Sequence, residues 1–300
     1  GDVMLDKYYF GKVDRISPEA PVPIVNIQKE ESRLGGASNV ANNIVSLGGH
    51  SLLCGVIGHD LFGKEIERIS RHKNIDTFLL KTSSPTITKA RIIGGKQQIV
   101  RVDYEDKSEL NADNKKLFRD TISRILPEYD ILVISDYGKG LISEDLCRYL
   151  IKLAHKYDKK VIIDPKGKNW EKYSGADIVT PNVKELSDIV GYTVPNTDRA
   201  IEKAAREAIT NNHLTALLVT RSDKGMSLIG PIPPIHIPTH SEEVFDVSGA
   251  GDTVVATLGL CLAAGFEISE AMRTANIAAG IVVKKVGTAT LTIEELVQQK

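Results

Sequence analysis

The residues best suited to do chemistry lie in the string from Asp246 to Asp252, which opens a helical apolar pattern. The run Gly249, Ala250 and Gly251 would leave several backbone N–H groups at a helix start unshielded, where the helix dipole adds positive potential. Such a turn can bind an anion. Asp252 would lie within reach of a bound phosphate, where a carboxylate can take the proton of an attacking hydroxyl. The alternative is a tight turn in which Asp252 only favours the dipole.

A second group of residues suits a polyhydroxylated ligand. Asp6 is expected at the C-terminal end of a strand, the edge at which open α/β sheets bind ligands, and its carboxylate can accept hydrogen bonds from a sugar diol. Gly35 and Gly36 form a turn before a helix, and Asn39 lies in its first turn. Each also has a structural alternative: a solvated turn residue for Asp6, an ordinary turn for the glycines and local backbone hydrogen bonding for Asn39.

Asn182 and Glu185 are three positions apart at an expected helix start, so their side chains share one face. An amide oxygen and a carboxylate suit a hydrated magnesium ion. The alternative is a glutamate in the first helical turn that is stabilised by the helix dipole.

A phosphorylated ligand requires a cluster of cations, because a dianion is held best by charge-assisted bonds from lysine and arginine. The candidates are Lys89, Arg91, Arg101, Lys139 and Lys166. Lys89 and Arg91 are two positions apart on an expected strand and so point to the same face, toward either the site or solvent.

The elements that must position these residues alternate between helical and strand periodicity, which predicts an α/β protein with a mostly parallel sheet flanked by helices. Helices are expected from Ser38, as an N-cap, over 145–157, and after Thr292, where Thr-Ile-Glu-Glu predicts a capping box. Short apolar runs predict buried strands at 52–57, 131–134, 161–163, 178–179 and 216–219.

Two segments break this alternation: 8–31, which contains several prolines, and 86–104, in which Gly94-Gly95 separates two apolar runs. The second is predicted to be a β-hairpin by its turn chemistry. We interpret both segments as strands of one small β-sheet lid beside the main sheet. The prediction is a single domain over 1–300 with a discontinuous lid from about 8–31 and 86–104.

Composition excludes several classes of partner. Lysine plus arginine total 38 and aspartate plus glutamate 39, so the net charge of -1 gives no general case for binding nucleic acid or an anionic membrane. The apolar stretches are shorter than the roughly 20 residues of a membrane helix. Cys54, Cys147 and Cys261 lack disulfide or zinc spacing, which fits a cytoplasmic location.

Four motifs together resemble the ribokinase-like (PfkB) carbohydrate kinases. The string 246–252 resembles the C-terminal signature, with Val247 in place of threonine, and 35–41 resembles the N-terminal signature. The run 181–185 resembles the Asn-x-x-Glu motif near magnesium and phosphate, and 220–225 the nucleotide loop. The motifs follow the family's order over nearly the whole chain.

The resemblance implies a ribokinase-like, doubly wound fold with helices on both faces of the sheet, and an ATP-dependent sugar kinase that uses magnesium. A monovalent cation is a further candidate cofactor. It implies that Asp252 is the base, that the Gly249 to Gly251 amides stabilise the transferred phosphoryl group, and that Asp6, the Gly35-Gly36 turn and Asn39 face the sugar. The residues that it assigns to the nucleotide are Asn182, Glu185, Thr220, Gly225 and Asn276.

Within the family, the runs 1–6, 15–23, 135–140 and 164–167 resemble members that phosphorylate O1 of D-glycero-β-D-manno-heptose 7-phosphate, a precursor of ADP-heptose and lipopolysaccharide. The alternatives are a kinase for another phosphosugar, of the fructose 1-phosphate or tagatose 6-phosphate type, and a non-catalytic sugar-binding protein.

We also expect a homodimer through the lid, as lids pair in some relatives. The apolar side chains expected to contribute are Val22, Ile24, Ile92 and Val100. A monomer whose lid closes over its own site is the alternative.

Overall fold

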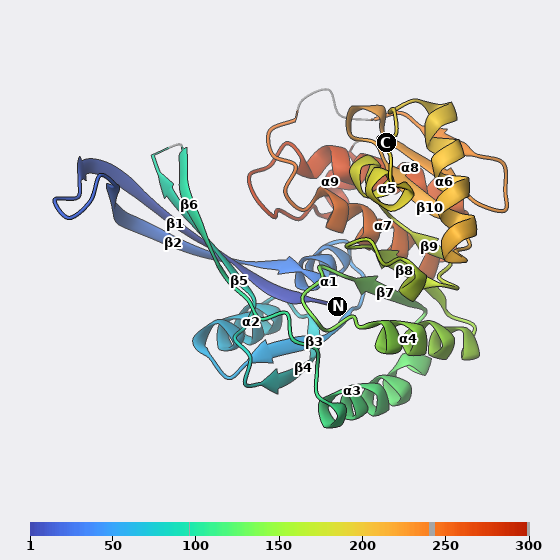
Figure 1. The fold of residues 1–300 in the computed structure, drawn as a ribbon, viewed down its shortest axis with the longest axis horizontal. Coiled ribbons are helices and arrows are strands. Elements are labelled where there is room, and N and C mark those ends of the chain that lie inside the picture. Colours follow the sequence, from blue (N-terminus) through green and yellow to red (C-terminus); the bar gives the residue numbers. More distant parts are fainter. Residues whose placement is uncertain (96, 240–243, 299–300) are drawn as a thin grey trace.

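A central sheet of mostly parallel strands carries the fold (Figure 1). The computed structural model describes residues 1–95, 97–239 and 244–298. The six-stranded sheet has the order β12-β11-β10-β9-β8-β7, with β7 to β10 parallel and the last two strands antiparallel. Its strands are β7 (Ile131–Ser135), β8 (Lys160–Asp164), β9 (Ile178–Val179), β10 (Leu217–Thr220), β11 (Met226–Ile229) and β12 (Ile235–Ile237).

Helices cover both faces of this sheet, because successive residues of each buried strand point to opposite cores. Val161 and Ile163 of β8 belong to one core, and Ile162 belongs to the other. Helices α3 (Ala112–Ile125), α4 (Glu144–Lys156), α5 (Val183–Val190) and α6 (Asp198–Asn212) contribute to the first core. Helices α1 (Ala37–Ser46), α7 (Ala250–Ala263) and α8 (Ile268–Val282) contribute to the second.

The remaining elements lie at the edges of the body. Strands β3 (Leu52–Gly58) and β4 (Asp76–Thr82) pair in parallel beside α2 (Leu61–His72), and α9 (Ile293–Val297) packs near α8. This arrangement confirms the predicted α/β class, and the five strands predicted from short apolar runs are present as β3, β7, β8, β9 and β10. Within the described ranges, no helix is both long and apolar enough to cross a membrane.

Strand β1 (Val3–Ile16) belongs to both the body and the lid. The amide of Asp2 donates to the carbonyl of Ser135 at the end of β7 (3.0 Å), and the first residues of β1 are buried. The same strand then leaves the body and continues to Ile16. Asp6 therefore lies inside β1, and the prediction that it ends a strand is wrong.

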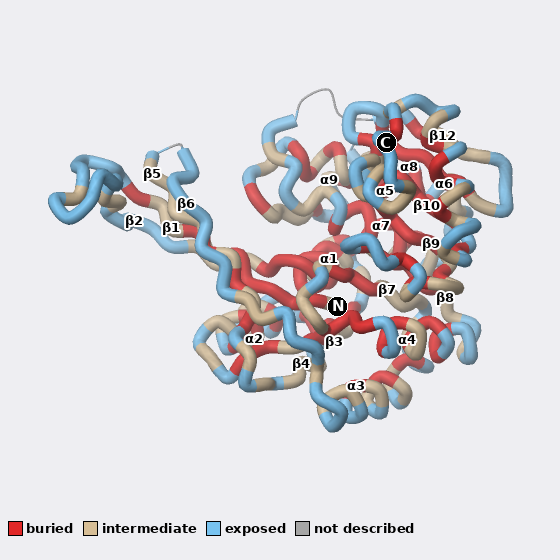
Figure 2. Tube along the Cα trace, in the orientation of Figure 1, coloured by how far each residue is buried: buried red, intermediate tan, exposed pale blue. Residues whose placement is uncertain are grey.

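The lid is a four-stranded sheet with the order β2-β1-β5-β6, which projects from the body as an arm (Figure 1). It is completed by β2 (Pro23–Gly36), β5 (Thr88–Gly94) and β6 (Gln97–Tyr104). Strands β5 and β6 form the predicted hairpin, with Gly95 at a positive φ of 64°. Figure 2 shows that the lid is mostly exposed or half-buried, whereas the body holds the buried core.

At two helix starts the capping residue expected from the sequence can be compared with the one in the structure. The capping box of α9 is present, with Thr292 and Glu295 each bonded to the other's backbone. By contrast, α1 begins at Ala37 with Gly36 as its N-cap, so the prediction that Ser38 caps this helix is wrong. The Ser38 hydroxyl instead donates to the carbonyls of Gly35 (2.6 Å) and Met4 (3.2 Å).

Gly225 packs closely against the segment that begins at the end of β12. It has a positive φ of 77°, and a Cβ there would collide with the carbonyl oxygen of Ile237. We expect Gly225→Ala to lower the free energy of unfolding by about 2 to 4 kcal/mol, from backbone strain and steric overlap together. Gly191→Ala, where φ is 80° and no atom lies within 4 Å, should cost only about 1 kcal/mol. Urea denaturation measures both values, and equal losses would contradict the steric argument.

Candidate active site

Asp252 lies in the first turn of α7 and is 4% exposed. The turn before it depends on Gly249, which has a φ of 79° and lies so close to α1 that a Cβ would approach Asn39 Nδ2 to 2.9 Å. A glycine is favoured here both by the left-handed conformation and by the close approach of α1.

Both oxygens of the Asp252 carboxylate accept hydrogen bonds. Asn39 Nδ2 donates to Oδ2 and the Tyr137 hydroxyl donates to Oδ1, each at 2.7 Å. Burial raises the pKa of Asp252 to about 6, and these two bonds oppose that rise because they stabilise the ionised form. A carboxylate of this kind is ionised at neutral pH and still basic enough to accept a proton.

A buried polar network fixes α1 against α7. Asn43 Nδ2 donates to the carbonyl of Asn39 (2.9 Å), and the Thr253 hydroxyl donates to Asn43 Oδ1 (3.2 Å). Asn39, Asn43 and Thr253 are all fully buried. Because each of these side chains has a partner, the network holds Asn39 and the start of α7 in one arrangement.

The amides at the start of α7 are not all available to an anion. The Ala250 amide donates to the carbonyl of Val247 (3.2 Å). Within the described residues, the amides of Gly249, Gly251 and Asp252 have no carbonyl partner, and no atom beyond the adjoining residues lies within 4 Å of where a Gly251 Cβ would stand. The open side of this turn is therefore at Gly251.

The predicted sugar-facing residues meet at the root of the lid. A Cβ on Gly35 would lie 2.5 Å from Asp6 Oδ2. Because glycine has no Cβ, the Asp6 carboxylate can pack directly against this turn. The next residue, Gly36, has a positive φ of 55°. Arg91 Nη1 donates to Asp6 Oδ1 at 2.6 Å. Arg91 thus points toward Asp6, and the Lys89 ammonium lies over the Tyr137 ring, so neither side chain simply extends into solvent.

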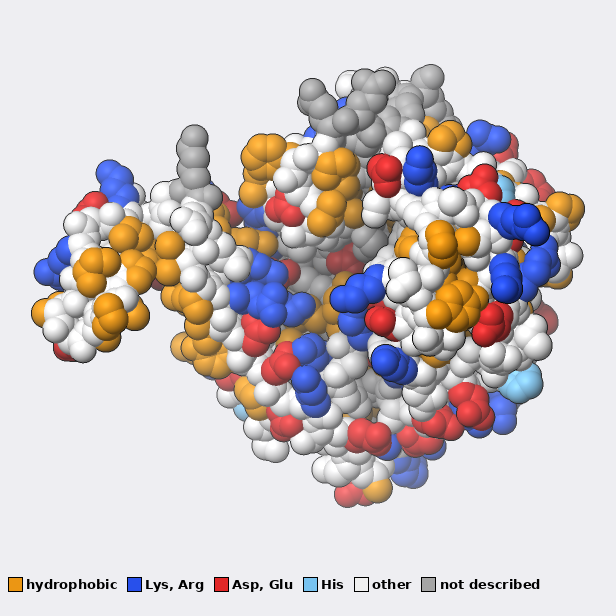
Figure 3. Space-filling view, turned by 45° about the horizontal axis from the view of Figure 1, so that its top comes forward, with side chains coloured by type: hydrophobic (Ala, Val, Ile, Leu, Met, Phe, Trp, Pro, Cys, Tyr) orange, Lys and Arg blue, Asp and Glu red, His pale blue; other side chains and the backbone are white. Residues whose placement is uncertain are grey.

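Four of the five predicted cations act on one another. Burial is the main cause of a lowered pKa at Lys89, which Asp6 opposes. The charges of Lys139, Arg91 and Arg101 lower that pKa further, which shows that the four cations are neighbours. Figure 3 shows lysine and arginine side chains gathered around a hollow where the lid meets the body.

The outer cations already have acidic partners. Arg101, half-exposed, pairs with Asp103 (2.8 Å), and Lys139 pairs with Glu105. Lys166 pairs instead with Glu185 Oε1 (2.9 Å). A substrate phosphate at Arg101 or Lys139 would therefore compete with a carboxylate of the protein.

Asn182 and Glu185 form a reciprocal capping box at the start of α5. Asn182 Oδ1 accepts from the Glu185 amide (2.9 Å), and Glu185 Oε2 accepts from the Asn182 amide (3.1 Å). The structural alternative to metal binding is thus realised, and the metal role stays a prediction. In the described part of the chain, no group of three or more His, Cys, Asp or Glu side chains could hold a metal.

The surroundings nevertheless fit a hydrated magnesium ion. Asp164, at the end of β8, has a pKa raised well above its usual range, first by burial and then by the charges of Asp252 and Glu185. A divalent cation would offset this concentration of negative charge. Magnesium usually keeps several waters and takes only one or two carboxylates, which agrees with so few protein oxygens.

The residues predicted to bind nucleotide contact other parts of the protein. The Thr220 amide donates to the carbonyl of Pro181 (2.9 Å), which joins the end of β10 to the start of α5. Asn276 Nδ2 donates to the carbonyl of Pro238 (2.7 Å), and Gly225 packs against the same segment after β12. Their contacts with a nucleotide remain predictions.

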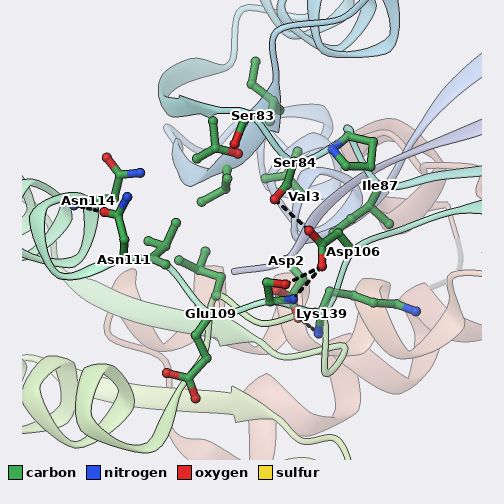
Figure 4. A pocket seen from close by; sticks show the side chains of 17 residues that line it. Asp2, Val3, Ser83, Ser84, Ile87, Asp106, Glu109, Asn111, Asn114 and Lys139 are labelled. Atoms are coloured by element: carbon green, nitrogen blue, oxygen red, sulfur yellow. Dashed lines mark hydrogen bonds between the residues drawn. The ribbon is translucent and has the colours of Figure 1, made fainter.

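Sequence reasoning gave no role to Tyr137 or Asp2. Asp2 Oδ2 accepts from the amides of Tyr137 (2.7 Å) and Lys139 (3.1 Å), so it holds the loop that carries the tyrosine. Asp2 and Lys139 also line a cavity of about 170 Å³. Figure 4 shows both side chains at this cavity. Tyr137 lay within a run that resembles the heptose kinases, but nothing in that run indicates its contact with Asp252.

Comparison with known proteins agrees with this geometry. The model of the pfkB family carbohydrate kinases matches residues 3–295. The chain belongs to this family. The pfkB chain is 46% identical over 298 residues to the Bifunctional protein HldE of Haemophilus influenzae, covering 99% of this chain but only 61% of that protein. It is 45% identical over 297 residues to a protein of Bordetella bronchiseptica named D-beta-D-heptose 7-phosphate kinase, covering 99% and 93%.

Solved structures confirm the ribokinase-like fold of this pfkB chain. Phosphofructokinase-2 from Escherichia coli superposes with a TM-score of 0.82 at 21% identity, covering 99% of this chain and 95% of that one. Ribokinase from Thermotoga maritima gives 0.77 at 22% identity, covering 100% and 97%.

The burial of Asp252 predicts a pH-dependent effect of its removal on stability. The folded protein holds the Asp252 proton more tightly, with a pKa of about 6 against the ordinary aspartate value of 3.8. This group's contribution to stability therefore falls as the pH rises from about 4 to 6 and stays low above that. We expect Asp252→Asn to raise the free energy of unfolding by about 2 kcal/mol at pH 8, with the gain vanishing near pH 4.

Urea denaturation across this pH range measures the effect, with Asp188→Asn as the control because Asp188 is exposed. A difference between Asp252→Asn and the unmodified protein that is the same at pH 4.5 and pH 8 would contradict the raised pKa.

Proposed function

We propose that this chain transfers the γ-phosphate of ATP to O1 of D-glycero-β-D-manno-heptose 7-phosphate, giving the 1,7-bisphosphate and ADP. The observation that carries the proposal is a buried, doubly hydrogen-bonded Asp252 at the start of α7, beside a cluster of cations. The name of the Bordetella bronchiseptica relative supports the choice of sugar. Since the chain spans 61% of the HldE protein, any further activity of such a longer protein is outside this proposal.

In the proposed reaction, O1 of the sugar attacks the γ-phosphorus and its proton passes to the Asp252 carboxylate. The bond from the γ-phosphorus to the bridging oxygen breaks, and ADP leaves. The amides of Gly249, Gly251 and Asp252 would stabilise the negative charge that develops on the transferred phosphoryl group. Magnesium, when bound, would neutralise charge on the β- and γ-phosphates, and Glu185 and Asn182 would hold it through water.

The lid root supplies the proposed sugar and phosphate contacts. Asp6 is positioned by Arg91 to accept hydrogen bonds from the sugar hydroxyls. Lys89 is the best candidate for the substrate phosphate, because no salt bridge within the described residues occupies it. Lys139 and Arg101 would join it by exchanging their carboxylate partners for phosphate.

We propose a cytoplasmic location together with this function. Neither Cys54 nor Cys147 forms a disulfide in the described part of the chain, as expected in a reducing compartment. ATP, the proposed phosphoryl donor, fits the same location.

The proposed function is tested by ADP release from ATP with a panel of sugars. We expect turnover with heptose 7-phosphate, and a kcat/KM about tenfold to a hundredfold lower for heptose without the phosphate, because a charge-assisted contact is lost. Asp252→Asn should lower kcat by ~10²- to 10⁴-fold and leave the binding of ATP and sugar phosphate within about tenfold.

Three outcomes would contradict parts of the proposal. A higher kcat/KM with fructose 1-phosphate or tagatose 6-phosphate would show that the proposed substrate is wrong. An equal kcat/KM for heptose with and without the 7-phosphate would contradict a binding site for that phosphate. Near-native turnover by Asp252→Asn would contradict the assignment of Asp252 as the base.

We also propose that two lids pair to form a homodimer. Val22 and Val100 are 51% and 45% exposed on the lid, and Ile24 and Ile92 are half-buried beside them. An exposed sheet with apolar side chains needs cover, which a two-fold partner provides.

Sedimentation equilibrium at micromolar concentration should therefore give twice the mass of 32.8 kDa. Val100→Glu should dissociate the dimer, because it places a charge on the face that the partner lid would bury. Leu61→Glu, at a residue 77% exposed on α2, should leave the dimer intact. A single 32.8 kDa species for the unmodified protein, with or without ATP and sugar phosphate, would exclude a stable dimer.

A further inference from the structure

The loop after β7 brings one tyrosine into contact with three parts of the site. The Tyr137 hydroxyl donates to Asp252 Oδ1 (2.7 Å). The ammonium of Lys89 lies over the Tyr137 ring, 5.4 Å from its centroid. The backbone amide of Tyr137 donates to Asp2 Oδ2 (2.7 Å). One side chain thus joins the proposed base to the proposed phosphate-binding cation.

We propose that Tyr137 is a positioning residue for phosphoryl transfer: its hydroxyl fixes the direction of the Asp252 carboxylate, and its ring supports Lys89. This inference rests on the proposed function, in which Asp252 accepts the proton of the sugar hydroxyl.

The carboxylate needs two donors to have one orientation. Asn39 holds Oδ2 from α1, and Tyr137 holds Oδ1 from the loop after β7. With only one donor the carboxylate would turn about its Cβ–Cγ bond. Proton transfer depends on an acceptor held within a few tenths of an ångström of the productive position, so the second donor affects the rate more than binding.

Tyr137 is itself held firmly. Besides the bond to Asp2, the neighbouring Gly138 amide donates to Asp136 Oδ1 (2.7 Å), and Lys172 pairs with Asp136 Oδ2 (2.5 Å). Burial, and then the charge of Asp252, raise the pKa of Tyr137 well above its usual range. The hydroxyl therefore keeps its proton throughout the working pH range and remains a donor to Asp252.

Several charged or polar groups face Asp252 besides Tyr137. Asn39 faces it from α1, Asp6 from β1 and Lys89 from β5, and Asp252 in turn acts on Asp164 of β8. Asp6 raises the pKa of Asp252, whereas Lys89, Asn39 and Tyr137 lower it. Loss of the Tyr137 hydroxyl alone removes a bond to the ionised form, so it raises the pKa of Asp252.

The test compares Tyr137→Phe with the unmodified protein, using ATP and heptose 7-phosphate. The acid limb of kcat/KM should move to higher pH by about one to two units, because less Asp252 is ionised at a given pH. On the plateau above this limb, kcat should fall about tenfold through lost orientation. The KM for the sugar phosphate should change less than about threefold, since the ring stays beneath Lys89.

Tyr192→Phe is the control. The Tyr192 hydroxyl also donates to a carboxylate, Glu207 Oε2, at 3.0 Å, and this pair is separate from the contacts that hold Tyr137 and Asp252. Its acid limb should stay where it is in the unmodified protein. Thermal unfolding and ATP binding show whether each variant is folded. If Tyr137→Phe does not fold, a fluorinated tyrosine at position 137 keeps the ring and donates more strongly, and the acid limb should move to lower pH.

The results separate this inference from the proposed function. A shifted limb and lower kcat in Tyr137→Phe, without either change in Tyr192→Phe, support it. An unchanged limb with kcat within twofold, or the same shift in both variants, overturns it. If the unmodified protein releases no ADP with any sugar phosphate, the proposed function itself fails, and the role of Tyr137 in it falls as well.

Discussion

The arrangement of the site depends on one hydrogen bond, from Asn39 Nδ2 to Asp252 Oδ2, between residues 213 positions apart. It joins the starts of α1 and α7, which come from the two ends of the chain and each follow a glycine turn. Because both groups are buried, separating the helices would leave an unpaired amide and an unpaired carboxylate, at a cost of about 1 to 3 kcal/mol each. The starts of α1 and α7, which carry Asn39 and Asp252, are therefore fixed relative to each other.

Folding removes several carboxyl groups at this edge of the sheet from water, which costs free energy. Burial is the main cause of a raised pKa at Asp2, Asp164 and Asp252 alike. A different group opposes this rise in pKa at each carboxyl. Backbone amides oppose it at Asp2, side-chain donors at Asp252, and chiefly the charge of Lys166 at Asp164. Such a concentration of perturbed carboxyls is typical of a site kept for chemistry rather than for stability.

The distance in sequence between partners decided what could be predicted. The capping box of Thr292 and Glu295 spans three positions and follows from the sequence alone. Asn182 and Glu185 have the same spacing, and the structure shows the cap, so the pattern could not separate a cap from a ligand pair. The contact of Tyr137 with Asp252 spans 115 positions and depends on how the loop after β7 packs against α7, for which no local signal exists.

Strand β1 runs without a break from the body into the lid, so the lid is anchored to the body at its root and free at its tip. Its root cannot turn as a hinge without breaking the ladder that pairs Asp6 with Arg33 and Lys89. Bending is easiest where the ladder is irregular, and β1 shifts register with β2 only beyond Phe10. The tip of the lid is then the part that bends, and its root, with Asp6 and Lys89, moves with the body.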